Sequence, residues 1–221
     1  MNTVAVVLAA RAEAELGVIP ALAEHEGGRT FLRSVTSTLT KAGCSVLTVV
    51  GVEADRVEEW HPGAQMVTAG SWKDRPGSVL LSGLAAARHG GAERMVVLPV
   101  DMPALRVSTL KTLLNQTLEE GAALRPTFEG APGFPVVLSL RAAETLLAAD
   151  DHQSPEALLT SLAPKTVAVK DPGVVVRIRD AALYERLLGH PPREAPPPKR
   201  RARKTAGPPP TLESESVQPH E

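Results

Sequence analysis

The feature that most constrains this chain is the alternation of short β-branched runs with longer amphipathic segments. Parallel strands joined by crossover helices produce this pattern, and nearly continuous apolar runs such as VAVVL indicate strands covered on both faces. The predicted strands are Val4–Leu8, Val46–Val50, Met95–Leu98, Val136–Leu138 and Val174–Ile178. Apolar spacing of three and four predicts helices over Thr30–Ala42, Val79–Ala87, Val107–Glu119, Arg141–Ala149, Pro155–Leu162 and Ala181–Leu188. We therefore expect a three-layer α/β fold with a mostly parallel sheet and an antiparallel excursion around residues 123–138.

Composition changes sharply after Leu188, where the remaining chain holds nine prolines, a basic run from Lys199 to Lys204 and an acidic end. Such a segment buries too little apolar surface to offset the entropy of ordering it. The sequence thus predicts one domain over residues 1–188 and a disordered tail over residues 189–221, rich in proline and basic residues. The basic run is either a solvated charge cluster or a docking patch for a protein or nucleic acid.

Several classes of protein are disfavoured by composition. Cys44 is the only cysteine, so an intrachain disulfide is excluded. The apolar stretch Val4–Ala10 is too short to span a membrane and follows no basic region, so we expect no membrane partner and a cytoplasmic location. The net charge of -1 and an aromatic content of 3% argue against nucleic-acid binding by the domain.

Ligands of open parallel sheets bind beyond the carboxyl ends of the strands. Three segments lie next to the ends of predicted strands and are therefore candidates for the ligand-binding site. They are Leu8-Ala9-Ala10 with the loop to Gly28, Asp101-Met102-Pro103, and Asp171-Pro172-Gly173.

These segments resemble, in order, the motifs of the molybdenum-cofactor cytidylyl- and guanylyltransferases, the MobA/MocA-like NTP transferases. Leu8-Ala9-Ala10 resembles the start of the signature L-A-A-G-x-S-x-R-M-G-x-x-K, with Gly17 at its second glycine. The later matches are Arg75-x-x-Ser78-Val79-x-x-x-Gly83-Leu84, Leu98-Pro99-Val100-Asp101-Met102-Pro103, Gly133-Phe134-Pro135 and Asp171-Pro172-Gly173 through Tyr184. The resemblance covers nearly the whole domain and implies a Rossmann-like fold of the nucleotide-diphospho-sugar-transferase type.

The resemblance also implies site residues. Asp101 is expected to bind Mg²⁺, and the nucleotide is expected to contact Leu8, Ala9, Ala10, Arg11, Arg75 and Ser78. The implied reaction is Mg²⁺-dependent transfer of NMP from an NTP to a phosphorylated small molecule. CTP is the preferred donor, because Leu8-Ala9-Ala10 is closer to the cytidylyl branch than to the L-A-G-G of the guanylyl branch.

This sequence departs from the family signature where the triphosphate binds. Arg11 replaces the first glycine, Glu13 and Glu15 take the serine and arginine positions, and Pro20 takes the lysine position. Two carboxylates there would repel a triphosphate, although Arg11 could contact phosphate from a new direction. Near the carboxyl end, Arg177 and Arg179 stand where the family has D-I-D, which removes the second metal carboxylate.

Two hypotheses follow. The chain is either a Mg²⁺-dependent nucleotidyltransferase or a catalytically inactive homologue that serves as a binding or regulatory module, and the rewritten phosphate loop favours the second. Simpler roles remain open for three residues: Asp101 as an acidic cap before a helix, Ser78 as a helix cap, and Asp171 as part of a β-turn. Cys44 is expected to be a buried structural thiol, and the histidines show no metal-ligand spacing.

Overall fold

A central sheet of eight strands organises the molecule, for which a computed structural model describes residues 1–10 and 15–197. Seven strands follow one another across the sheet in the order β10-β7-β9-β6-β1-β4-β5, and β8 pairs with β7. Their bounds are β1 Thr3–Ala9, β4 Ser45–Val50, β5 Gln65–Thr68, β6 Arg94–Pro99, β7 Ala123–Phe128, β8 Ala131–Pro132, β9 Val136–Ser139 and β10 Lys165–Ala168. A separate antiparallel pair joins β2 (Glu24–His25) to β3 (Arg29–Thr30). Strand β1 lies inside the sheet, between β4 and β6.

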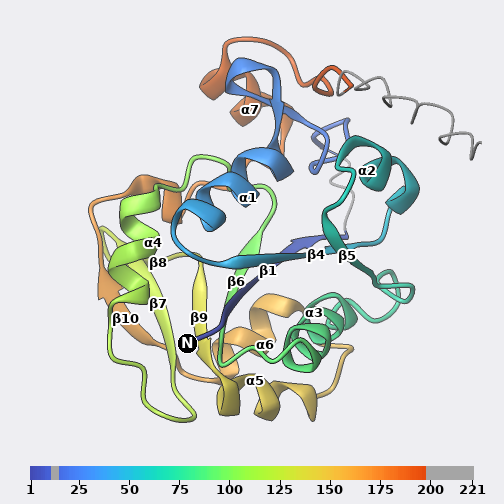
Figure 1. Cartoon of the computed structure of the whole chain (residues 1–221). Coiled ribbons are helices and arrows are strands. Elements are labelled where there is room, and N and C mark those ends of the chain that lie inside the picture. The colour runs from blue at the N-terminus through green and yellow to red at the C-terminus, as the bar shows by residue number, and fades with distance from the viewer. Residues whose placement is uncertain (11–14, 198–221) are drawn as a thin grey trace, which may run out of the picture.

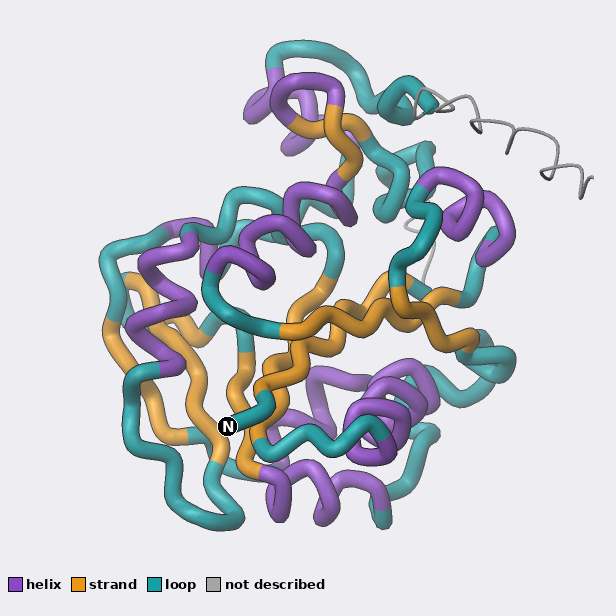
Figure 2. The backbone as a smooth tube through the Cα atoms, viewed as in Figure 1, coloured by secondary structure: helices purple, strands orange, loops and turns teal. Residues whose placement is uncertain are grey.

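Helices cover both faces of the sheet (Figure 1). Helices α1 (Phe31–Lys41) and α4 (Val107–Leu114) lie on one face, and α3 (Ser78–His89), α5 (Leu140–Leu147) and α6 (Pro155–Ser161) lie on the other. Helix α7 (Ala181–Leu188) lies beyond α1, and α2 (Ala54–Trp60) follows β4. Figure 2 shows the same arrangement as strands between two helical layers. The structure thus confirms a three-layer, mostly parallel α/β fold.

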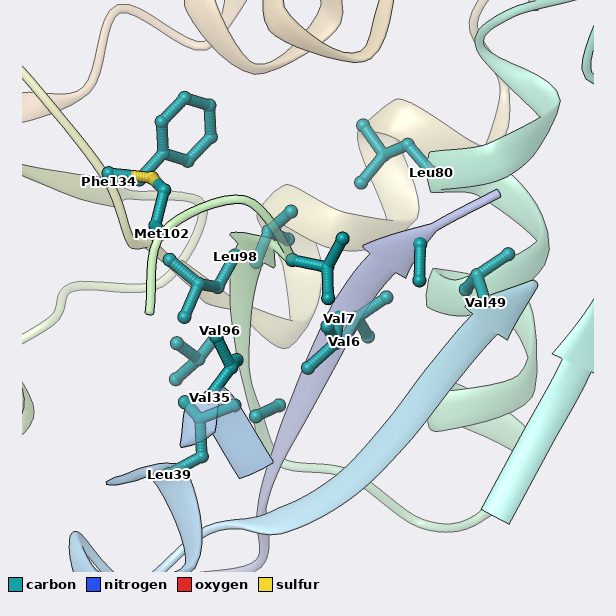
Figure 3. Close-up of a cluster of buried hydrophobic side chains, with 14 of the residues drawn as sticks. Val6, Val7, Val35, Leu39, Val49, Leu80, Val96, Leu98, Met102 and Phe134 are labelled. Atoms are coloured by element: carbon teal, nitrogen blue, oxygen red, sulfur yellow. The ribbon is translucent and has the colours of Figure 1, made fainter. Parts of the chain in front are cut away.

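The core forms where the inner strands meet these helices (Figure 3). Val6 and Val49, on the central strands, face α3 at Gly83, where a Cβ atom would come within 2.3 Å of Val6 and 2.7 Å of Val49. Only glycine permits this close approach of helix and sheet, which explains Gly83 without any ligand. Val6 is fully buried and Val4 is nearly so, whereas Leu8 is only partly buried. Leu8 is partly accessible because it lies at the carboxyl end of β1.

Most of the predicted elements are confirmed. Strands at Val4–Leu8, Val46–Val50, Met95–Leu98 and Val136–Leu138 are present, and β9 pairs antiparallel with both β6 and β7 in the expected excursion. Ser154 caps α6 by accepting a hydrogen bond from the Ala157 backbone N–H at 3.1 Å. The helix predicted over Val107–Glu119 ends at Leu114, because Asn115 begins a turn.

The strand predicted over Val174–Ile178 is wrong. Pro172–Val174 is instead a 3₁₀ turn, and the chain after it crosses the carboxyl ends of the strands. Val174 O accepts from Phe134 N at 2.7 Å, and Ile178 N donates to Asp101 O at 2.8 Å. Val174 and Ile178 are apolar because they are buried, and not because they belong to a strand of the sheet. Crossing this edge brings the following arginines over the end of β6.

The packed chain also extends past Leu188, where the tail was expected to begin. Glu24 N donates to Arg193 O at 2.8 Å and Ala195 N donates to Leu22 O at 2.9 Å, so this segment pairs with the loop before β2. Ala195 is buried, and Glu194 forms an ion pair with Arg56 at 2.5 Å. Proline does not prevent this packing, because the backbone groups that bond, Arg193 O and Ala195 N, belong to residues between the prolines. The basic run Lys199–Lys204 lies outside the described residues.

No helix in the described part of the chain is both long and apolar enough to cross a lipid bilayer.

Candidate functional site

A cavity of about 290 Å³ opens at the carboxyl ends of β1 and β6. Leu8 and Pro99 are neighbours in the parallel pairing of these strands, and both line the cavity. This is the edge where an open parallel sheet binds ligands. The other lining residues are Ala10, Pro20, Val79, Val100, Asp101, Phe134, Ser154, Pro155, Glu156, Arg177 and Arg179.

An ion-pair cluster of Asp101, Arg177 and Arg179 forms the polar part of the cavity. Arg177 Nε donates to Asp101 Oδ1 at 3.0 Å, Arg177 Nη2 donates to Oδ2 at 2.7 Å, and Arg179 Nε donates to Oδ2 at 3.1 Å. The Asp101 side chain is 4% exposed, against 22% for Arg177 and 43% for Arg179. Hydrogen bonds between charged groups are strong when shielded from water, so Asp101 is held firmly in this geometry.

This cluster does not fit Mg²⁺. A hard divalent cation needs several oxygen ligands, whereas here both oxygens of the one carboxylate accept hydrogen bonds from guanidinium groups. A cation bound at Asp101 would have to displace those hydrogen bonds and lie beside two fixed positive charges. Electrostatic repulsion in this shielded position opposes that exchange. The metal role expected for Asp101 therefore disagrees with the geometry of this chain.

The loop after β1 is only partly described. Of the three residues expected to contact the nucleotide here, Leu8 and Ala10 line the cavity and Ala9 does not. Arg11 and Glu13 lie outside the described residues. Glu15 is exposed, and Pro20, at the lysine position of the family signature, is buried and closes one side of the cavity. The cavity thus has an apolar wall where the signature has a cation.

Arg75 and Ser78 lie near the start of α3 and neither lines the cavity, although the adjacent Val79 does. Arg75 Nε pairs with Asp151 Oδ1 at 2.8 Å, and its side chain is 52% exposed. Ser78 is the first residue of α3 and does not cap it, because the cap position belongs to Gly77. Ser78 Oγ is buried without a hydrogen-bond partner among the described residues. A polar atom in that condition is a place where a ligand or water can bind.

Asp171 is confirmed as part of a turn. Its Oδ1 accepts from Gly173 N at 2.9 Å, and its Oδ2 accepts from Thr109 Oγ1 at 2.7 Å and from Arg106 N at 3.0 Å. Asp171 therefore fastens the 3₁₀ turn to the start of α4. This is a structural role, and it fixes the direction of the chain that leads to Arg177.

Two further expectations concern metal and thiol chemistry. Among the described residues, ligand atoms of Asp150, Asp151 and His152 lie within 4.8 Å of one another, so one histidine does have acidic neighbours. Asp150 is exposed and Asp151 is already paired with Arg75, as is common for surface acids that bind no metal. Cys44 is buried, and burial raises the pKa of its thiol to about 11. A thiol with that pKa is a poor nucleophile at neutral pH, in agreement with a structural role.

Sequence reasoning missed aromatic and polar residues of the cavity. Phe134 lies under the guanidinium of Arg177, with the cation 5.6 Å from the ring centroid. Ser154 and Glu156 line the cavity from the start of α6. Gly133-Phe134-Pro135 was noted only as one of the matches to the family motifs, and nothing in the local pattern at Ser154 or Glu156 points to a ligand.

The fold and site can now be compared with known proteins. The family model for the MobA-like NTP transferase domain matches residues 5–167. No curated protein matches the sequence.

Solved structures of the same fold are similar over most of the chain. A nucleotidyl transferase from Methanothermobacter is 20% identical, with a TM-score of 0.71 over 86% of this chain and 97% of its own. The Mycobacterium tuberculosis protein Rv0371c, solved in complex with manganese, is 19% identical, with a TM-score of 0.63 over 86% and 99%. A CMP:2-keto-3-deoxy-manno-octonic acid synthetase complexed with CTP is 14% identical, with a TM-score of 0.61 over 86% and 98%. Similarity at this level establishes the shared fold, and the family model, which spans most of the domain, establishes more: this chain belongs to the MobA-like NTP transferase domain family.

Proposed function

We propose that this protein is a catalytically inactive member of its family, which uses the cavity beside Asp101 as a metal-independent binding site. The observation that carries the proposal is the bidentate contact of Arg177 with Asp101, reinforced by Arg179. Metal-dependent nucleotidyl transfer needs carboxylates that are available to a cation. Here the corresponding carboxylate already has two guanidinium partners.

The phosphate loop supports the same conclusion. Pro20 gives the cavity an apolar wall at the lysine position, and Glu15 is an exposed acid at the arginine position. Nucleotidyl transfer depends on cations that neutralise the negative charge developing on the phosphates. Loss of the lysine and the arginine of the signature therefore weakens the reaction. Binding requires less, because a cavity with a few polar groups is sufficient.

The second candidate is the family reaction, Mg²⁺-dependent transfer of CMP from CTP to a phosphorylated acceptor of the molybdenum-cofactor type. One observation favours it: the buried Ser78 Oγ lacks a partner among the described residues and lies at the helix start that the resemblance assigns to the nucleotide. The cytidylyl character of Leu8-Ala9-Ala10 makes CTP the nucleotide to test first.

Titration calorimetry with CTP, GTP and ATP, each with and without Mg²⁺, tests the proposal, together with an assay for pyrophosphate release. We expect Mg²⁺ to change the affinity for any nucleotide by less than about threefold, and no pyrophosphate to be released. Tight Mg²⁺-dependent binding of CTP with turnover by the unmodified protein would establish the second candidate instead.

Two parts of the proposal rest on the sequence alone. The protein works in the cytoplasm, and the basic run Lys199–Lys204 is a contact for a protein partner.

A further inference from the structure

We propose that Arg179 is the ligand-binding cation of the cavity, and that its ligand is a small organic anion with a carboxylate or phosphate group beside a compact apolar body. This inference rests on the proposed function, because it concerns the same cavity. It adds the chemical class of the ligand and the residue that recognises it.

The two arginines of the cluster differ in how much of the guanidinium is already used. Arg177 directs Nε and Nη2 to Asp101, and its Nη1 lies 3.8 Å from Glu156. Its guanidinium also lies over the ring of Phe134. Arg177 is therefore committed on every side and acts as a structural group that fixes Asp101.

Among the described residues, only one nitrogen of the Arg179 guanidinium has a hydrogen-bond partner. Its Nε donates to Asp101 Oδ2 at 3.1 Å, and within the described part of the chain its two terminal nitrogens have no hydrogen-bond partner. Its side chain is 43% exposed, so water or a ligand can reach these nitrogens. The contact with Asp101 holds the guanidinium in place, and the planar pair of free N–H donors matches a carboxylate or a phosphate.

The charges near Arg179 also favour an anion. Two guanidinium groups face the single carboxylate of Asp101, which leaves one positive charge in excess within the cluster. Glu156 opposes it only weakly, since its side chain is 59% exposed and water screens its charge. The cluster is thus suited to an anionic group that completes the neutralisation of Arg179.

The rest of the cavity selects against a bare inorganic ion. Its walls include Leu8, Val79, Val100, Phe134 and Pro155, all apolar. Burial of apolar ligand surface against such walls contributes to binding in proportion to the area covered. A volume of about 290 Å³ lies at the small end of the range of ligand pockets, so the body must be compact.

Titration calorimetry on the full chain in the presence of EDTA tests the ligand class with four probes: phenyl phosphate, benzoate, inorganic phosphate and benzamide. We expect at least one of the two aromatic anions to bind about tenfold more tightly than both benzamide and inorganic phosphate. The comparison of phenyl phosphate with benzoate decides between phosphate and carboxylate. Equal binding of benzamide and the anions, or no binding of either aromatic anion up to about 10 mM, would overturn the proposal.

Variants test the assigned residue. Arg179→Met should weaken binding of the preferred anion about tenfold, and Arg179→Lys should weaken it less, because lysine keeps the charge but not the fork. Arg88→Met is the matched control, since Arg88 is 56% exposed and pairs with Glu144 on the surface. It should leave binding unchanged, and an equal loss in both Met variants contradicts the assignment.

Glu156→Gln keeps the test decisive if Arg179→Met fails to fold. Removal of this opposing charge should strengthen anion binding about twofold to threefold, and a weaker affinity would count against the proposal. Failure here is distinguishable from failure of the proposed function. Nucleotide turnover with Mg²⁺ refutes the inactive-homologue proposal, whereas a protein inert toward nucleotides that shows no preference for aromatic anions refutes only this inference.

Discussion

The guanidinium of Arg177 holds Asp101 through both carboxylate oxygens, with Nε 3.0 Å from Oδ1 and Nη2 2.7 Å from Oδ2. The backbone makes this contact possible, because Ile178 N donates to Asp101 O at 2.8 Å and fixes the crossing segment over the end of β6. The residue expected to bind a metal thus serves as the anchor of two cations. Stability and ligand chemistry at this edge of the sheet consequently depend on the same carboxylate.

The first prediction concerns that anchor. Asp101→Asn should lower the free energy of unfolding by about 2 to 3 kcal/mol, because a neutral amide leaves two partly buried guanidinium groups without their counter-charge. Thermal or urea unfolding measures the loss, with Asp74→Asn on the exposed loop before α3 as the control that should change little. If Asp101 were only an unpaired acid awaiting a metal, its neutralisation would leave the protein equally stable or more stable.

The second prediction separates two parts of the expected tail. Removal of residues 198–221 should leave the melting temperature unchanged, whereas removal from His190 onward should cost about 2 kcal/mol. The longer deletion loses two backbone hydrogen bonds to Leu22 and Glu24 and exposes the surface that Ala195 covers. It also removes the ion pair of Arg193 with Glu24. Equal melting temperatures for both truncated proteins would show that the packed segment contributes nothing to stability.

How much the sequence could predict depends on burial. Strands β1, β4 and β6 were recognised because helices cover both of their faces and each predicted run is apolar, except for Thr48 in β4. Strands β5 and β10 were missed because they lie at the two edges of the sheet, where much of each strand is exposed and no apolar run is required.

The site shows a different limit. The replacement of D-I-D by Arg177 and Arg179 was visible in the sequence, and so was Asp101. Their contact was not, because Asp101 and Arg177 are 76 positions apart and Val174–Ile178, which contains Arg177, was wrongly expected to be a strand in the sheet. A strand would have placed both arginines on one face of the sheet. The crossing segment instead brings both of them to Asp101, at the carboxyl end of β6.

The third prediction is a loss of stability in mild acid. Burial is the main cause that lowers the pKa of His61 from 6.5 to about 4, with a further contribution from the charge of Arg33. Its Nε2 lies 3.1 Å from Thr30 Oγ1, which caps α1. Burial likewise lowers the pKa of His25. The unfolded chain therefore binds protons more readily than the folded one below pH 6.5, and stability present above that pH is lost as the pH falls toward 4.

For His61 the loss should be about 2 kcal/mol, discounted for its partial exposure. Urea unfolding from pH 7 to pH 4.5 measures it. His61→Gln should flatten the pH dependence, and His89→Gln, on the exposed end of α3, should not. An unchanged slope in His61→Gln would assign the acid sensitivity to other groups.

The last prediction asks whether metal binding can be restored by exchange of the two cations. In the variant with both Arg177→Asp and Arg179→Asp, three carboxylates would stand where one carboxylate and two guanidinium groups now meet. Oxygen ligands of this kind suit a hard divalent cation, and without one their mutual repulsion destabilises the fold. We therefore expect a lower melting temperature in EDTA that recovers on addition of Mn²⁺, since a ligand that binds only the folded state stabilises it. Binding of Mn²⁺, measured by titration calorimetry, should be at least about tenfold tighter than in the unmodified protein.

The same pair of substitutions combined with Asp101→Asn is the control, and it should lose most of that gain in Mn²⁺ affinity. Tight Mn²⁺ binding by the unmodified protein, equal to that of the variant, would mean that the guanidinium groups yield to a metal and that the inactive-homologue proposal is wrong.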